Sequence, residues 1–119
     1  MGAPVAHFEI SSKDPGRAAA FYGKLFDWTV SPGPAPDYSM VDTGAGEDGV
    51  GGGIGATDGP DDPGGITIYV KVDNLTTYLD RAEELGGRTI LPPTDLPEDY
   101  GAFALLADPD GNTIGLWVA

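Results

Sequence analysis

The chain contains the same pattern of residues twice, and this internal repeat restricts its possible folds more than any other feature. The extended segments 5–10 and 66–72 each lead through a polar turn into an amphipathic stretch. When the second copy is laid on the first, His7 falls on Thr67 and Leu25 falls on Leu85. Two facing copies of one strand-helix-strands unit would form a cup, and residues at matching points would line one site. The two sides of that site would differ, because threonine cannot replace imidazole as a proton carrier or usual metal ligand.

The first copy predicts one strand, one helix and three further strands. Asp14 is placed to cap the helix, and Pro15 suits a first helical position. The expected apolar face of this helix holds Phe21 and Leu25, with Ala18 and Tyr22 beside them. The expected elements are strand 5–11, helix 17–26 and strands 27–30, 38–43 and 49–56.

The second copy predicts the same order. Asn74 can cap a helix that Gly86 and Gly87 close, and residues 92–100 are expected to form a loop. The turn at residues 108–112 predicts a hairpin between the last two strands. The expected elements are strand 66–72, helix 75–85 and strands 88–91, 103–107 and 113–118.

This order predicts an α+β fold in which two βαβββ modules form a cupped mixed sheet. The expected single domain spans residues 1–119, with module one at 5–56, a linker at 57–65 and module two at 66–118. A length of 119 residues is enough for one hydrophobic core. The ferredoxin-like fold is the main competitor, but it needs fewer strands per helix.

Composition excludes several classes of partner and chemistry. The formal charge is -13, from 19 acidic and 6 basic residues, which argues against nucleic acid and anionic membranes as partners. No apolar run approaches the roughly 20 residues that span a bilayer. The absence of cysteine removes disulfides, thiolate metal sites and cysteine nucleophiles. The N-terminus shows no signal-peptide pattern, so the expected location is the cytoplasm.

Three segments resemble the vicinal-oxygen-chelate superfamily, which includes glyoxalase I, bleomycin-resistance proteins, fosfomycin-resistance enzymes and extradiol dioxygenases. They are the Asp-Pro-Asp-Gly-Asn turn at 108–112 before an apolar final strand, Val-Asp-Asn at 72–74, and Phe-Tyr-Gly-Lys-Leu-Phe at 21–26. The resemblance covers about residues 5–118 and implies a glyoxalase-like fold. It implies little about the reaction, because similar folds carry unrelated chemistries.

The resemblance also implies where a divalent metal would be held, by one ligand from the first and last strand of each module. Those positions fall on His7, Thr67, Gly115 and a residue near Gly53 or Gly55. Only His7 is a usual ligand, whereas a catalytic metal needs about three protein ligands and an open position. Glu9 lies on the same strand as His7 and does not complete such a set. We therefore expect no metal and no other cofactor.

Strand alternation predicts which side chains line the cup. Phe8 and Ile10 should pack on the first helix, so His7 and Glu9 point the other way. The expected buried residues of the later strands are Ile66, Ile68, Val70 and Val72, and Ile114, Leu116 and Val118. The predicted substrate-binding residues are His7, Glu9, Thr67, Tyr69, Gly115 and Trp117.

These residues predict a binder of a small, partly aromatic metabolite or antibiotic that works without a metal. One alternative is an enzyme of the glyoxalase or dioxygenase type that uses His7 and Glu9 as acid and base or in a non-standard divalent metal site. Another is an interaction module of a larger complex. Whether the chain is an enzyme stays open, and no catalytic residue is assigned. A homodimer is expected, because the superfamily commonly pairs its modules. The glycine run at 49–55 has no P-loop spacing and predicts close packing or a bulge.

Overall fold

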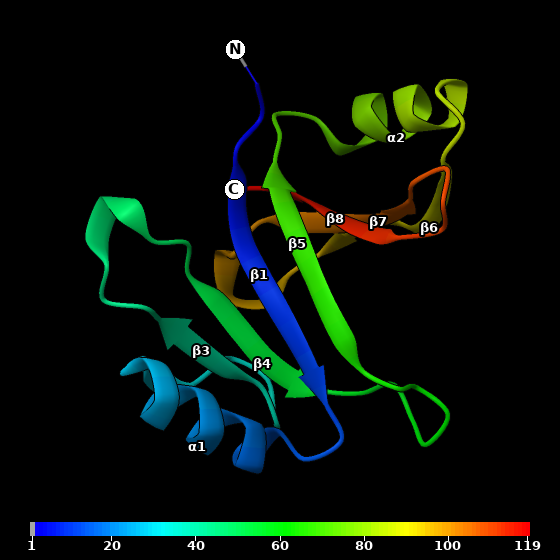
Figure 1. Ribbon diagram of the computed structural model, residues 1–119. Helices are drawn as coiled ribbons and strands as arrows, with labels where there is room; N and C mark the ends of the chain where they lie inside the picture. The colour runs from blue at the N-terminus through cyan, green and yellow to red at the C-terminus, as the bar shows by residue number, and fades with distance from the viewer. Residues whose placement is uncertain (1) are drawn as a thin grey trace. The chain divides into compact units, whose positions relative to one another are not determined.

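The secondary structure follows the order that the repeat predicts. The computed structural model describes residues 2–119, and in that range it contains two α-helices and eight strands, an α+β fold (Figure 1). The first copy comprises β1 (Val5–Ser12), α1 (Pro15–Phe26), β2 (Thr29–Pro32), β3 (Ser39–Asp42), the short 3₁₀ turn η1 (Gly46–Asp48) and β4 (Gly52–Ala56). The second comprises β5 (Gly65–Lys71), α2 (Leu75–Glu84), β6 (Arg88–Asp95), the 3₁₀ turn η2 (Pro97–Asp99), β7 (Ala102–Ala107) and β8 (Thr113–Val118).

The contacts divide the chain into two compact units. The first unit holds residues 7–66, and the second holds residues 67–119 together with residues 2–6. The strand order is β2-β3-β4-β1 in the first unit and β6-β7-β8-β5 in the second. In each unit one pair is parallel (β1 with β4, β5 with β8) and the other pairs are antiparallel. Both units are therefore mixed βαβββ modules with one topology, as predicted.

Both helices begin at the predicted caps. The Asp14 carboxylate accepts a hydrogen bond of 3.1 Å from the backbone N–H of Arg17, and α1 begins at Pro15, slightly before the predicted start. The Asn74 side chain accepts one of 3.0 Å from the N–H of Thr77. After α2, Gly86 takes a positive φ of 104°, which favours glycine. No helix within residues 2–119 is long and apolar enough to cross a membrane.

The core of the first unit lies between α1 and its strands. Its buried residues are Ile10, Val41 and Ile54, and the residues packed around them are Phe8, Ala18, Ala19, Tyr22, Trp28 and Val30. The predicted inward direction of Phe8 and Ile10 is confirmed. The prediction that Phe21 and Leu25 face the core is wrong, because their side chains are 58% and 59% exposed. The small residues Ala18 and Ala19 bring the helix close to the strands, which leaves the neighbouring stripe in solvent.

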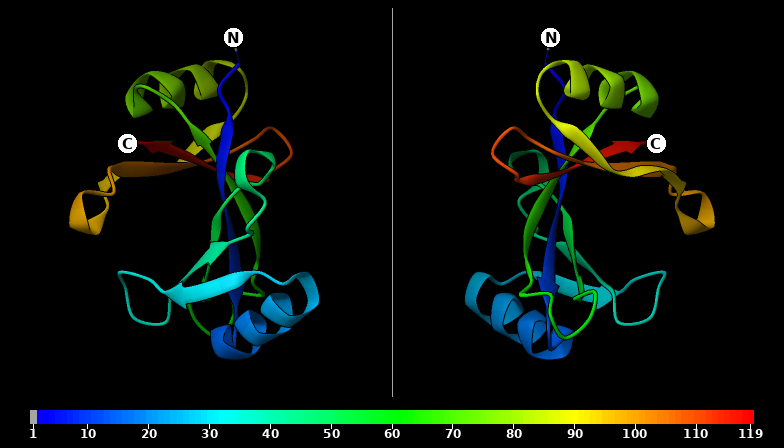
Figure 2. Two further views of the ribbon diagram at one scale, coloured as in Figure 1. Left: turned by 90° about the vertical axis from the view of Figure 1, so that its left-hand side faces the viewer. Right: turned by 90° about the vertical axis from the view of Figure 1, so that its right-hand side faces the viewer.

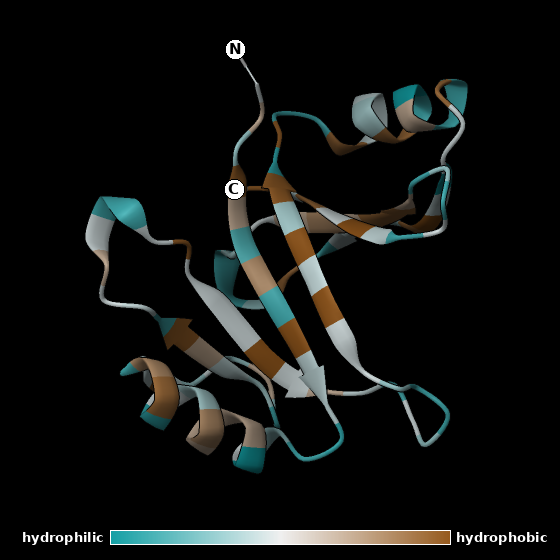
Figure 3. Ribbon diagram, viewed as in Figure 1, coloured by the Kyte–Doolittle hydropathy of each residue, from teal (hydrophilic) through white to brown (hydrophobic). Residues whose placement is uncertain are grey.

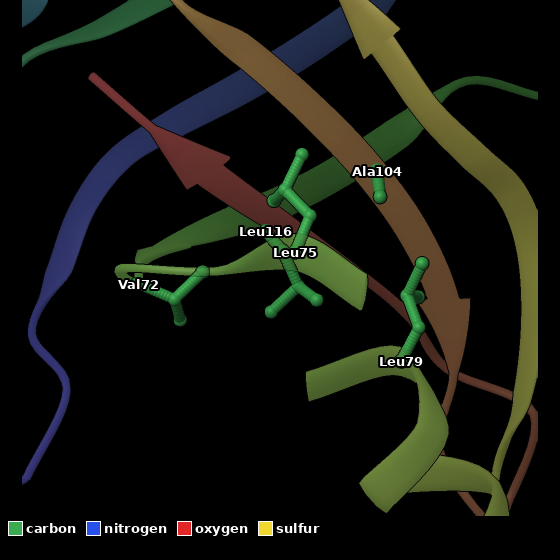
Figure 4. Packing of buried hydrophobic residues seen from close by; sticks show 5 residues of the cluster. All are labelled: Val72, Leu75, Leu79, Ala104 and Leu116. Atoms are coloured by element: carbon green, nitrogen blue, oxygen red, sulfur yellow. The ribbon is translucent and has the colours of Figure 1, made fainter. Parts of the chain in front are cut away.

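The core of the second unit is formed by Val72, Leu75, Leu79, Ala104 and Leu116 (Figure 4). Hydropathy alternates along β5, as predicted (Figure 3). The prediction that Ile66 and Ile68 are buried is nevertheless wrong, since they are 68% and 39% exposed. The reason is the position of α2, which contacts β6, β7 and β8 and does not cover the start of β5. Val70 and Val72, nearer to α2, do pack in the core.

Prolines lie inside two strands where the sequence predicts breaks. Pro32 is the last residue of β2, and β6 runs to Asp95 through Pro92 and Pro93, so the predicted loop 92–100 begins later than expected. Both strands are outermost in their four-strand order, where a residue without an N–H can be accommodated. The pairing of β6 with β7 also shifts register on either side of Leu91. Figure 2 shows η2 at the end of this pair, in orange.

Candidate functional site

Two predicted site residues of the first unit are connected through a third side chain, Tyr38. The Tyr38 hydroxyl donates a hydrogen bond of 3.3 Å to Glu9 Oε2, and it lies 3.2 Å from His7 Nε2. With Glu9 as the acceptor of the hydroxyl proton, the phenol oxygen is placed to accept a hydrogen bond from His7 in the tautomer that carries its proton on Nε2. The result is a chain of three hydrogen-bonding groups from imidazole to phenol to carboxylate.

Tyr38 is held in place by the loop before β3 and by glycines of β4. The backbone N–H of Gly33 donates a hydrogen bond of 2.8 Å to the carbonyl of Tyr38, which closes the proline-rich loop. The phenol ring covers Gly53, where a Cβ atom would collide with it, and it also approaches Gly55. Tyr38 is not among the site residues that the sequence predicts. Gly53 and Gly55 were the sequence signal that could have identified it, because the space left by two glycines on a strand is filled by a large side chain from elsewhere.

Burial changes the pKa values of His7 and Glu9, the two outer members of this hydrogen-bonded series. Burial lowers the pKa of His7 below its ordinary value. Burial raises the pKa of Glu9, the Tyr38 hydrogen bond opposes that effect, and the charge of Asp58 adds to it. Both shifts favour the neutral forms. Each side chain therefore stays uncharged over a wider pH range than it would in free solution, His7 toward lower pH and Glu9 toward higher pH.

The other predicted residues lie in the second unit, on the face of its strands turned away from α2. Tyr69 of β5 and Gly115 of β8 are paired in the parallel ladder, and the tyrosine ring covers the glycine so closely that a Cβ there would collide with it. Thr67 precedes Tyr69 by one period of the strand, so the two residues share a face. The ring of Phe103 on β7 lies 6.3 Å from that of Tyr69.

Trp117 extends this aromatic surface. It pairs with Phe103 across the β7–β8 ladder, and its indole N–H donates a hydrogen bond of 2.8 Å to the carbonyl of Tyr100. The ammonium of Lys71 lies 5.5 Å from the centre of the Trp117 ring, within the range of a cation–π contact. The hydrogen bond and the ladder hold the indole in one orientation, and the ring surface that remains is suited to stacking.

The ladder registers show that both units have a glycine covered by a tyrosine ring at equivalent positions. Glu9 pairs with Gly53 in the β1–β4 ladder, as Tyr69 pairs with Gly115 in the β5–β8 ladder. Of the two candidate positions on β4, Gly53 is therefore the counterpart of Gly115. A tyrosine ring covers the glycine in both places.

This arrangement does not fit the metal that the resemblance implies. The positions for ligands from β4 and β8 are glycines under tyrosine rings, and the position on β5 is Thr67. Within residues 2–119, no three His, Cys, Asp or Glu side chains form a group that could hold a metal ion. His7 and Glu9 alone fall short of the usual three protein ligands.

The second unit also has a wide, shallow groove beside the end of β5. There the backbone N–H of Lys71 donates a hydrogen bond of 2.9 Å to the carbonyl of Pro4. The groove is lined by Gly2, Ala3, Pro4, Lys71, Val72, Asp73, Tyr78, Val118 and Ala119. Lys71 is the only residue that it shares with the aromatic surface described above, so it is a separate feature.

Two curated proteins are similar in sequence to this chain over nearly its whole length. The chain is 29% identical over 115 residues to a Mycobacterium bovis protein named "Putative glyoxylase CFP32", covering 93% of this chain and 44% of that protein. It is 30% identical over 140 residues to the anthracycline biosynthesis protein DnrV of Streptomyces peucetius, covering 98% of this chain and 46% of that protein. The chain thus spans less than half the length of these relatives.

A solved structure shows the same fold at low identity. The methylmalonyl-CoA epimerase of Mycobacterium tuberculosis superposes with a TM-score of 0.73 at 14% identity, over 96% of this chain and 86% of that one. Because the identity is so low, this likeness establishes the glyoxalase-like fold and not the reaction. The sequence profile of one family matches residues 5–116 and confirms the resemblance read from the turn and helix motifs. The chain belongs to the Glyoxalase/Bleomycin resistance protein/Dioxygenase superfamily.

Proposed function

We propose that the protein binds a small, partly aromatic molecule without a metal ion. The observation that carries this proposal is the tyrosine over a glycine at each position where a metal ligand would come from β4 or β8. Aromatic rings fill these places with surfaces for stacking, and the His7–Tyr38–Glu9 chain offers polar groups that can orient a ligand. The proposed contact residues are His7, Glu9, Thr67, Tyr69, Gly115 and Trp117, and Tyr38 is added to them.

The test measures metal content and ligand binding separately. Elemental analysis of protein purified without chelator is expected to show no stoichiometric divalent metal in the wild type or in His7→Ala. A thermal-shift screen of aromatic metabolites and antibiotics is then run with and without EDTA. We expect ligands that raise the Tm equally in both conditions, since binding without a metal is insensitive to chelation. A stoichiometric metal that disappears in His7→Ala, together with ligand binding lost in EDTA, would contradict the proposal.

An enzyme of the glyoxalase or dioxygenase type is the second candidate, because burial shifts the pKa values of both His7 and Glu9. In that case these residues would carry protons or take part in a non-standard divalent metal site. Turnover of a panel of such substrates is measured with added Ni²⁺, Zn²⁺, Mn²⁺ or Fe²⁺. Turnover that is lost in His7→Ala supports this candidate, and no turnover with any of the metals counts against it.

We further propose that residues 1–119 act as one domain with modules 5–56 and 66–118, and that two copies form a homodimer. Exposed apolar side chains on α1, among them Phe21, Leu25 and Phe26, support a seam that depends on apolar contact. The relatives are long enough to hold two such chains. Sedimentation of the wild type is expected to give a dimer mass, and Phe21→Lys should shift it toward the monomer. A monomer at all concentrations would exclude the dimer. The absence of cysteine supports a cytoplasmic location.

A further inference from the structure

The second unit has one strand face that differs in charge from the rest of the protein. Val70 pairs with Leu116 on the core side, so the next pair, Lys71 with Trp117, points away from the core. Trp117 in turn pairs with Phe103, and one period along the strands Tyr69 pairs with Gly115. We call these five residues the aromatic face: Tyr69, Lys71, Phe103, Gly115 and Trp117.

The aromatic face contains a cation and no carboxylate, in a chain whose net charge is -13. The second cation near this face is Arg88. It belongs to the row of paired residues at the start of β8, in which Thr113 pairs with Ala107 and Ala107 pairs with Arg88. The carboxylates of this unit lie on α2, in turns or at strand ends: Asp73, Asp80, Glu83, Glu84, Asp95, Glu98, Asp99, Asp108 and Asp110. Asp95, at the end of β6, pairs with Ala102, which packs against the core. None of these carboxylates belongs to a residue of the aromatic face; Glu98 and Asp99 precede Tyr100, whose carbonyl accepts the hydrogen bond of the Trp117 indole.

Lys71 is placed to meet an anion beside a stacked ring. Its side chain is exposed, and its ammonium lies 5.5 Å from the centre of the Trp117 ring. A flat ring that stacks on Trp117 or Phe103 would bring its substituents near this ammonium. A carboxylate there would gain a charge-assisted hydrogen bond, a neutral amide would gain less, and a cation would be repelled.

We propose that the aromatic face binds a small planar aromatic molecule that carries a carboxylate, with Lys71 as the residue that recognises the charge. This inference rests on the proposed function and deepens it by naming the chemical class of the ligand. It also makes cationic aromatic molecules poor ligands of this face. Lys71 thereby becomes a specificity-determining residue in addition to the seven residues proposed above.

The test uses three probes with one ring system and different charges. They are 2-naphthoate, 2-naphthamide and the 2-naphthamidinium cation, titrated into ¹⁵N-labelled protein at pH 7.5 and followed by NMR. The readouts are the shifts of the Trp117 indole N–H and the Tyr69 and Lys71 amides, and the dissociation constants derived from them. We expect 2-naphthoate to bind most tightly and the cation most weakly. In Lys71→Met the affinity for 2-naphthoate should fall about threefold to tenfold, and that for 2-naphthamide should stay within about twofold.

Two further variants separate this effect from a general change of charge. Arg81→Met on α2 removes the same charge away from the aromatic face and should leave the order of the probes unchanged. Lys71→Arg should preserve the preference for 2-naphthoate. Equal binding of the three probes, or no effect of Lys71→Met, overturns this inference and leaves aromatic binding intact. If no probe shifts the aromatic face, both this inference and the aromatic part of the proposed function at that face are overturned.

Discussion

At the scale of single residues, the His7–Tyr38–Glu9 chain combines two half-buried titrating groups with a phenol between them. Its position in the first unit depends on a residue that is distant in sequence, because Tyr38 comes from the loop before β3. The phenol can accept a hydrogen bond on one side and donate one on the other. Protonation of His7 or ionisation of Glu9 therefore changes the stability of the unit.

We predict opposite pH dependences for Glu9→Gln and His7→Gln. The folded-state pKa of Glu9 is raised from 4.5, so its stabilising contribution is present below that value and is lost as the pH rises through the folded pKa. Glu9→Gln should consequently have a higher Tm than the wild type at pH 7.5, with a gain that shrinks toward pH 4. The gain is expected to be small, because the carboxyl group is only half-buried and solvent screens it.

His7→Gln is the matched variant, for which the expected pH dependence of stability has the opposite sign. The folded-state pKa of His7 is lowered from 6.5, so its contribution is present above 6.5 and is lost as the pH falls through the folded pKa. Relative to this variant, the wild type should lose stability as the pH falls below about 6.5. Thermal unfolding between pH 4 and pH 8 measures both differences. Parallel curves for all three proteins would contradict the assigned shifts.

We predict that Gly53→Ala destabilises the protein through Tyr38. A Cβ at this position collides with the phenol ring, so the ring or strand must move, at a cost of about 1–3 kcal/mol. In a Tyr38→Ala background the same substitution should cost less than about 0.5 kcal/mol, because the ring is gone. Urea unfolding provides the four free energies of this cycle.

Gly51→Ala is the control for this cycle, since a Cβ there meets only the carbonyl oxygen of Val41 at 3.4 Å. It should change stability little in either background. An equal cost for Gly53→Ala with and without the Tyr38 ring would show that the glycine is required by the backbone rather than by the phenol.

At the scale of elements, each helix covers only part of its strands. α2 buries Leu75 and Leu79 against the second unit's core and leaves Leu85, just beyond its end, 72% exposed. α1 presents Ala18, Ala19 and Tyr22 to its core and exposes Phe21, Leu25 and Phe26. Apolar residues that repeat at helical spacing therefore contribute unequally to stability.

We predict a large difference between two leucine substitutions at α2. Leu79→Ala should lower the free energy of unfolding by about 2–5 kcal/mol, since it leaves a cavity among Val72, Ala104 and Leu116. Leu85→Ala should stay within about 0.5 kcal/mol of the wild type because its side chain is largely in solvent. Urea unfolding measures both values. Comparable losses would mean that Leu85 is covered in solution, for example by a second copy.

At the scale of the whole molecule, the charge of -13 opposes the folded state, because folding concentrates like charges. We predict that raising NaCl from 20 mM to 500 mM raises the Tm, since the Debye length falls below roughly 5 Å and repulsion between carboxylates is screened. Choline chloride at equal ionic strength should have a similar effect. A Tm that does not change in either salt would mean that the repulsion is already negligible at low salt.

The fold was predictable from local signals because each of them depends on neighbours in sequence. Asp14 and Asn74 cap their helices as expected, and the turn at 108–112 joins the last two strands. The predicted site residues were placed by alternation alone, which correctly put Phe8 and Ile10 on the side of the core. Alternation predicts the strand face on which a side chain lies, but not whether another element covers that face. It therefore predicted buried positions for Ile66 and Ile68, which α2 does not cover.

The order of strands and helices, the duplication, the family and the charge can be read from the chain alone, because caps, periodicity and composition are local or additive properties. The position of Tyr38 between His7 and Glu9, and the tyrosine rings over Gly53 and Gly115, follow instead from tertiary packing. Those contacts join residues that are far apart in sequence, or depend on the ladder register of parallel strands. No local pattern encodes such a register, since it is selected by the packing of the whole unit.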